Sequence, residues 1–228
     1  MPTRVITVGD GETLQVDARP GSSVEIAVQG VPAGDAPQVV PLSQRDPRWR
    51  NVPLGHSTHY TIGSAGCALC CATMVAGMVE LGITPAELQD RLLLSNGFYG
   101  ANLNWAAVPR VVPDLDFGGI INWVNGPADM GVVYEHLDDH PVILWVDFHP
   151  GGGQNTHFVM AFAGFGDDLL IADPWDGYTG NLLLRYALDD WDLARAIYGI
   201  RPLYVTPGGP VDTERVAIAV DSWPEKRE

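Results

Sequence analysis

Apolar and polar residues follow two different patterns along the chain, and the change comes near residue 140. Before it, apolar residues recur every three or four positions, which is typical of amphipathic helices. In "ITPAELQDRLLLSNG", Thr84 is the expected N-cap, Pro85 takes the first helical position and Glu87 completes a capping box. Helices are predicted within residues 67–81, 84–96, 102–112 and 126–140.

After residue 140 the apolar residues form short runs separated by turns rich in glycine and aspartate, a pattern that predicts β-strands. A helical half followed by successive strands indicates an α+β domain, in which the helices pack against an antiparallel sheet. A functional site is expected in the cleft between two such halves. Strands are predicted at 141–148, 157–165, 168–174, 181–188 and 200–205.

The N-terminal residues alternate apolar and polar positions over three short runs, "RVITV", "TLQVDA" and "SVEIAVQ". A stretch rich in glycine and proline, "GVPAGDAPQ" (30–38), is then typical of a linker. These patterns predict three parts, which are a small β appendage with its linker at 1–36, the main domain at 37–206 and a C-terminal tail at 207–228.

The formal net charge of the protein is −15, with 28 acidic residues against 13 lysines and arginines. Nucleic-acid phosphates and anionic lipids repel such a surface, so neither is expected as a partner. No apolar run reaches the length of about 18 residues that a membrane span requires. The N-terminus lacks the basic and apolar segments of a secretory signal. We therefore expect a cytoplasmic or phage-associated protein and make no prediction of its oligomeric state.

All three cysteines lie within the five residues of "CALCC" (67–71), a spacing that does not suit a disulfide framework. His56 and His59 lie close enough in sequence to suggest a zinc site with them. Zinc-binding cysteine pairs usually lie in tight turns, however, whereas these cysteines begin an apolar helical run. We therefore expect no metal and no other cofactor.

Helical spacing assigns two of the cysteines to the protein core. Cys70 and Cys71 fall on neighbouring helix faces that are otherwise apolar, and cysteine is among the most buried residue types. The face of Cys70 continues through Met74, Met78 and Leu81.

Cys67 differs because it falls in the first turn of the predicted helix. There the helix dipole stabilises a thiolate, and Ser64 is expected to cap the helix. Gly66 would let another backbone or a substrate approach closely. Cys67 is therefore either a reactive nucleophile or a third buried thiol.

A nucleophilic cysteine requires a histidine to accept its proton and a further group to orient that histidine. His157 begins one predicted strand, and the chain reverses at "GFGDD" into the next. In a hairpin centred there, paired residue numbers sum to about 330, which places Asp173 opposite His157. Directly opposed side chains have Cβ atoms about 4.5–5.5 Å apart, within hydrogen-bonding reach. The pair could orient a catalytic imidazole or lie at the surface end of a hairpin.

The other five histidines have no such partner in the predicted structure. Gln44, in "PLSQRDPRW", is a candidate donor to the oxyanion that a thiolate attack creates, because a side-chain amide donates without titrating. The backbone N–H of Cys67 could supply the second hydrogen bond. The five histidines lie in a polar loop (His56, His59), on or after an acidic helix (His136, His140) and after a strand (His149).

Taken in order, "PLSQRDPRWRNVPLG", "TIGSAGCALCCATMV" and "HFVMAFAGFGDDLLIADPWDG" resemble the cysteine peptidases related to bacteriocin-processing peptidases, within the papain-like superfamily. The resemblance covers roughly residues 38–205 and implies a papain-like fold. It implies that Cys67 is the nucleophile and His157 the general base. It also implies that Asp173 orients the base and that Gln44 lines the oxyanion hole.

The activity implied by this resemblance is hydrolysis of peptide bonds by a Cys-His-Asp triad. The substrate would be a peptide or protein, and peptidoglycan peptides, in a bacterial or phage wall-degrading role, are one such class. No transporter segment is seen in the sequence, so processing of double-glycine leaders is not implied. Acyl transfer or deamidation by the same triad is an alternative. A further alternative is a non-catalytic binding or phage structural protein that retains the fold.

Overall fold

The computed structural model describes residues 4–8, 12–16, 39–138, 140–147, 156–165, 167–186 and 192–206. Its central strands are β5 (Leu115–Phe117), β6 (Ile121–Asn122), β7 (Val142–Asp147), β8 (Thr156–Phe165), β9 (Asp168–Asp173), β10 (Tyr178–Asn181) and β11 (Ile197–Val205). They form a seven-stranded sheet in the order β10-β9-β8-β7-β11-β5, and β6 also pairs with β11. Every pairing is antiparallel, so the predicted α+β class is confirmed.

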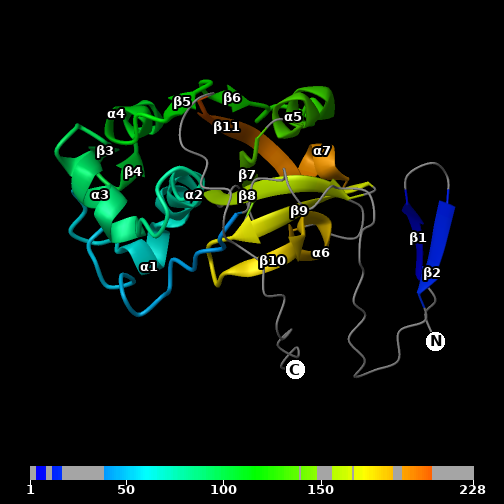
Figure 1. The fold of residues 1–228 in the computed structure, drawn as a ribbon, viewed down its shortest axis with the longest axis horizontal. Helices are drawn as coiled ribbons and strands as arrows, with labels where there is room; N and C mark the ends of the chain where they lie inside the picture. The colour runs from blue at the N-terminus through cyan, green and yellow to red at the C-terminus, as the bar shows by residue number, and fades with distance from the viewer. Residues whose placement is uncertain are drawn as a thin grey trace.

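The helices lie in two groups on either side of this sheet (Figure 1). The helical half contains α1 (Ile62–Ala65), α2 (Cys67–Ala76), α3 (Pro85–Leu93), the 3₁₀ helix η2 (Trp105–Ala107) and α4 (Val108–Val111). A short hairpin of β3 (Phe98–Tyr99) and β4 (Asn102–Leu103) joins them. The second group contains α5 (Met130–Leu137), α6 (Leu182–Tyr186) and α7 (Leu193–Ala196).

Helix α2 is buried on all sides, because every residue from Leu69 to Ala76 is excluded from solvent. A helix that is apolar all round belongs in a protein core, and α2 packs directly against β8. The helix ends at Ala76, earlier than predicted, and Gly77 follows it. The predicted continuation of its face is therefore wrong at Leu81, which lies beyond the helix and is 60% exposed.

Helix α3 confirms the predicted capping box. The hydroxyl of Thr84 accepts a hydrogen bond from the N–H of Glu87, at 3.3 Å, and the Glu87 carboxylate accepts one from the N–H of Thr84, at 2.9 Å. Pro85 occupies the first helical position, where its missing N–H costs nothing. These bonds fix the start of a helix whose Leu88 and Leu92 are fully buried.

Alternating side chains of the sheet contribute to two apolar clusters. Ile143 of β7 and Met160 of β8 are cross-strand partners that pack with the helical half. Their neighbours Leu144 and Val159, also partners, pack with the second helical group. Because side chains alternate with a period of two, each strand supplies both clusters. The sheet is thus covered on both faces.

The predicted strand at 181–188 is wrong. The strand comes earlier, as β10, and the run "LLLRY" forms α6. Leu182 and Tyr186 are four residues apart, so helical geometry places both on one face, where both are buried. The helix predicted at 102–112 is confirmed only in part, since β4 and η2 occupy its beginning.

At the N-terminus, β1 (Arg4–Val8) and β2 (Glu12–Val16) form an antiparallel hairpin in which Ile6 lies opposite Leu14. Two of the three strands predicted there are therefore present. The third, at 23–29, lies outside the described residues, as do the predicted linker and residues 207–228. Within the described parts of the chain, no helix combines the length and apolar character needed to cross a membrane.

Candidate active site

Cys67 is the first residue of α2 and is partly exposed. Gly66 precedes it as the N-cap, and its carbonyl accepts the N–H of Cys70 at 2.9 Å, which starts the helix. A Cβ at Gly66 would lie 2.4 Å from the carbonyl oxygen of Ile62, so only glycine lets α1 and α2 pack this closely. The glycine before Cys67 thus fixes the position of the cysteine backbone.

Ser64 does not cap α2, contrary to the prediction. It lies inside the short helix α1, where its hydroxyl accepts the N–H of Thr61 at 2.9 Å and donates to the Thr61 carbonyl at 3.1 Å. The structure has two successive helices where one was predicted, and Ser64 belongs to the first of them. The N-cap of α2 is Gly66, which has no side chain, so no side chain caps the N-terminal amides of α2 at Cys67.

The prediction that Cys70 and Cys71 belong to the core is confirmed, since both side chains are fully buried. Burial raises the pKa of both thiols well above the ordinary value, and the neighbouring charge of Cys67 adds to this effect. Neutral, inaccessible thiols are poor nucleophiles. Cys67 alone among the three is placed for chemistry.

His157 lies at the start of β8 and is buried. Its Nε2 atom is 2.8 Å from Oδ1 of Asp173, and the side chain of Cys67 lies close enough to interact electrostatically with the same ring. Burial lowers the pKa of His157, but the hydrogen bond to Asp173 and the negative charges of Asp173 and Cys67 raise it to about 9.

The hairpin that joins β8 and β9 brings His157 and Asp173 together in a different register from the predicted one. Met160 pairs with Ala172, and a bulge separates this pair from those nearer the turn. Continued by one residue, this register places Asp173 opposite Val159 and diagonal to His157. The two side chains remain on the same face, because the shift is by two residues, and they still form a hydrogen bond.

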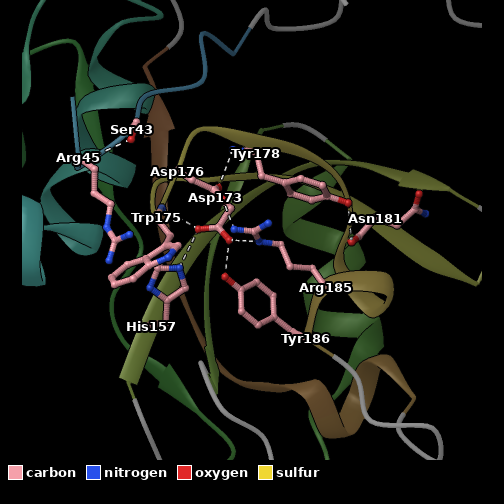
Figure 2. Close-up of polar contacts among 10 residues, drawn as sticks. All are labelled: Ser43, Arg45, His157, Asp173, Trp175, Asp176, Tyr178, Asn181, Arg185 and Tyr186. Atoms are coloured by element: carbon pink, nitrogen blue, oxygen red, sulfur yellow. Dashed lines mark hydrogen bonds and ion pairs between the residues drawn. The ribbon is translucent and has the colours of Figure 1, made fainter. Parts of the chain in front are cut away.

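Asp173 is completely buried, and besides the predicted His157 it binds polar groups that the sequence did not predict (Figure 2). Its Oδ1 also accepts the N–H of Trp175, at 2.8 Å. Its Oδ2 accepts hydrogen bonds from Nε of Arg185 and from the hydroxyl of Tyr186. Burial would raise the pKa of this carboxyl, but the hydrogen bonds from His157, Tyr186 and the Trp175 N–H, His157 foremost, hold it below its ordinary value. Asp173 is therefore a carboxylate.

Arg185 and Tyr186 come from α6, the segment predicted as a strand. A strand would have pointed these consecutive residues to opposite faces, so the wrong element hid their shared role. Arg185 also binds Asp176 at 2.8 Å, which ties α6 to the turn after β9. The sequence signal that could have revealed this helix is the four-residue spacing between Leu182 and Tyr186, which places both on one helix face.

Gln44 lies between the two halves of the candidate site. Its backbone N–H donates to the carbonyl of Pro174, at 2.6 Å, and its side-chain Nε2 donates to the carbonyl of Gly63, at 3.1 Å. The side chain is buried, yet its Oε1 has no hydrogen-bond partner in the described structure. Unused hydrogen-bonding capacity on a buried amide is rare in native proteins and is expected where a ligand binds.

Among the described residues, no other histidine forms a hydrogen bond with His157 or Asp173. His56 and His59 are exposed in a loop, and His136 forms a hydrogen bond with the hydroxyl of Tyr204, at 2.8 Å. His140 packs against the same tyrosine ring, and His149 lies outside the described residues. In the part of the chain that the structure describes, no three His, Cys, Asp or Glu side chains form a group that could hold a metal ion.

The structure thus brings three of the predicted residues together: Asp173 is hydrogen-bonded to His157, and Cys67 lies close to the His157 ring. Gln44 is attached to the backbone on both sides of them. Comparison with known proteins adds no relative to this picture: no protein-family model matches the sequence, and no curated protein matches it significantly.

Proposed function

We propose that the protein is a cysteine hydrolase that cleaves amide bonds, most readily those of peptides. The observation that carries this proposal is the His157 ring, which is hydrogen-bonded to the buried carboxylate of Asp173 and lies within interaction distance of the partly exposed Cys67. A thiol, an imidazole and a carboxylate in this order are the components of nucleophilic catalysis by cysteine.

In the first step, Cys67 would attack the amide carbon as a thiolate, paired with the imidazolium of His157. With a pKa of about 9, His157 is protonated at neutral pH and can donate its proton to the leaving amine. The amine departs, and the acyl group remains on Cys67 as a thioester. Water, deprotonated by the now neutral His157, then attacks the thioester and releases the acid.

Both steps pass through an oxyanion, which needs hydrogen-bond donors. The N–H of Cys67 is at the first position of α2, where backbone amides have no partner within the helix. Gln44 Nε2 carries two hydrogens, and its hydrogen bond to Gly63 uses one of them. These two donors are our candidates for the oxyanion hole.

The order of elements also supports the proposal. The cysteine begins a buried helix that precedes the sheet, the histidine begins a sheet strand and the carboxylate ends the next strand. This arrangement is compatible with the papain-like fold that the sequence resemblance implies. In its more specific form, the proposal is therefore that the protein is a peptidase of that superfamily.

The direct test is the rate of alkylation of native protein by iodoacetamide across pH, with each labelled cysteine located by mass spectrometry. We expect Cys67 to react well below pH 8 and at least about tenfold faster than Cys70 and Cys71, because they are buried. His157→Ala should abolish this reactivity at low pH, whereas His56→Ala, which alters an exposed histidine, should preserve it.

Equal and slow labelling of all three cysteines would rule out the hydrolase. If Cys67 is reactive, a screen of peptide libraries with wild type and with Cys67→Ala identifies the cleaved bond. Cleavage that survives in Cys67→Ala would show that another group, or a contaminant, is responsible.

A further inference from the structure

An open cavity of about 480 Å³ is lined by residues that are close in sequence to the candidate catalytic residues, such as Ser64 and Trp175. Residues in two of its walls form hydrogen bonds with the candidate catalytic residues. Gly63, on one wall, accepts the hydrogen bond from the side chain of Gln44, and Trp175, on another, donates its backbone N–H to Asp173. A group bound in this cavity would therefore lie next to an amide held by Gln44 and attacked by Cys67.

Arg45 lines this cavity and is held in place by an aromatic ring. Its Cζ atom lies 3.4 Å from the centre of the Trp175 ring, so the guanidinium stacks on the indole (Figure 2). Stacking fixes the plane of an arginine and leaves its N–H edges directed outward, which suits a planar carboxylate. Among the described residues, no carboxylate forms an ion pair with Arg45.

Arg50 lines the same cavity, five residues after Arg45 in the sequence. Its carbonyl accepts the N–H of Gly63, at 2.9 Å. A Cβ at Gly63 would lie 2.8 Å from the Cβ of Arg50, so this glycine lets the arginine backbone pack against the cavity wall. Arg50 likewise forms no ion pair with any residue that the structure describes.

The surrounding charges leave the cavity positive in an otherwise acidic protein. The net charge is −15, yet three of the 13 basic residues fall within residues 45–50. The acidic residues of the adjoining turns are already engaged, since Asp46 binds Arg48 at 2.8 Å and Asp176 binds Arg185 at 2.8 Å. Within the described structure, Arg45 and Arg50 are thus the two arginines of this segment without a counter-ion.

We propose that this cavity binds a carboxylate of the substrate, so that the favoured substrate is a peptide with an acidic group near the bond that is cleaved. The inference rests on the proposed function, because it assigns a substrate class to the same site. The carboxylate can come from an acidic side chain or from the C-terminus of a peptide, since both present the same planar anion to a guanidinium.

The test measures binding to the full-length Cys67→Ala protein by fluorescence anisotropy, so that it does not depend on catalysis. Three alanine-based peptides carry a neutral dye on the N-terminus. One has a glutamate and an amidated C-terminus, the second is its glutamine counterpart, and the third has uncharged side chains and a free C-terminal carboxylate. We expect one or both carboxylate peptides to bind about tenfold tighter than the glutamine peptide at low salt. Added salt should reduce this preference, because it screens exposed charges.

Arg45→Gln and Arg50→Gln, introduced separately into the same protein, should each remove most of this preference. Arg48→Gln is the matched control, because Arg48 lies in the same segment but is neutralised by Asp46, and it should keep the preference. Arg50→Gln leaves the stacking of Arg45 on Trp175 intact. A loss of the carboxylate preference in this variant therefore cannot come from a displaced Trp175 ring.

Equal binding of the glutamine and carboxylate peptides would overturn the inference, as would a preference that persists in both cavity variants. Which carboxylate peptide binds tighter identifies the source of the anion. Failure of the hydrolase proposal gives a different result, because unreactive Cys67 in the alkylation experiment would leave the arginine-dependent preference unchanged.

Discussion

The two sides of the central sheet bury their side chains by different means. On the helical side, α2 is packed by apolar contacts, and its one buried hydroxyl, Thr73, satisfies itself locally on the carbonyl of Leu69, at 2.7 Å. On the other side, α6 places a cation and a phenol on the buried carboxylate of Asp173. Cys67 is thus positioned by shape, and His157 is oriented by charge.

This difference predicts different responses to mutation. Apolar packing loses stability in proportion to the volume removed and leaves no charge behind. A buried ionic network fails more abruptly, because removal of one member leaves its partners charged and without a counter-ion. The site joins the two regimes where Cys67 lies close to the ring of His157.

The largest effect is expected from Asp173→Asn, which removes the charge and keeps the shape. It should lower the free energy of unfolding by about 3–5 kcal/mol, because His157 and Arg185 then lose their shared buried counter-ion. Urea denaturation followed by circular dichroism measures the change. The alkylation of Cys67 near pH 6.5 should slow in the same variant, since His157 would lose the carboxylate that favours its imidazolium.

Asp46→Asn is the control for this prediction, because Asp46 also pairs with an arginine but does so at the surface. An exposed ion pair contributes little, so the unfolding curve should hardly move. Equal effects of the two substitutions would mean that burial of the Asp173 network has no special cost. The contrast between the two sides of the sheet would then be lost.

The next effect belongs to the helical side. Leu92 and Leu94 lie two residues apart at the end of α3, but Leu92 is fully buried and Leu94 is 90% exposed. Leu92→Ala should cost about 3 kcal/mol in unfolding free energy, whereas Leu94→Ala should cost almost nothing. Neither should alter the pH profile of Cys67 alkylation. A shifted profile in Leu92→Ala would show that packing and charge are coupled more tightly than we infer.

The helical side was also the better predicted from sequence, and for a physical reason. A capping box is a local arrangement within four residues, so Thr84 and Glu87 are sufficient to predict it. The burial of Cys70 and Cys71 follows from an apolar helix in the same way. Near Ser64 the structure has two helices, α1 and α2, where the sequence predicted one. Their first residues, Ile62 and Cys67, lie so close together that the local sequence pattern did not separate them.

The charged side depends on contacts between segments that local patterns do not specify. The hairpin arithmetic placed Asp173 opposite His157, but the turn lies later than assumed, since Phe165 pairs with Asp168. Beyond the bulge the register is displaced by two residues from the predicted one. The prediction of contact survived because a two-residue shift preserves the face. Arg185 and Tyr186 could not be assigned, since a short apolar run is compatible with either a strand or a helix and the choice depends on tertiary packing.

A smaller effect is expected from pH. The folded pKa of His157, about 9, lies above its ordinary value of 6.5, so its protonation stabilises the protein fully below pH 6.5 and this contribution is lost as the pH rises through 9. Asp173 has the opposite sign: its lowered pKa stabilises the protein above about pH 4, and this contribution is lost on acidification. Both act together between these limits.

Comparison of wild type with His157→Gln isolates the histidine. The difference in unfolding free energy between the two proteins should be about 2 kcal/mol larger at pH 6 than at pH 9.5. Urea denaturation at both pH values measures it. His56→Ala should show no such dependence, because this histidine is exposed. A difference that does not change with pH would mean that His157 is buried in its neutral form.

The smallest effect is expected from Thr84→Ala, which removes the N-cap of α3. It should lower the free energy of unfolding by about 1 kcal/mol, because the N–H of Glu87 loses its side-chain acceptor. Thr84→Ser retains the hydroxyl and should retain the stability. Since the capping box lies within α3, and α3 packs against α2, Cys67 should be alkylated at the wild-type rate in both variants. A slower rate in Thr84→Ala alone would show that the position of Cys67 depends on the capping of a neighbouring helix, and would extend the influence of local hydrogen bonds from the helical side to the charged one.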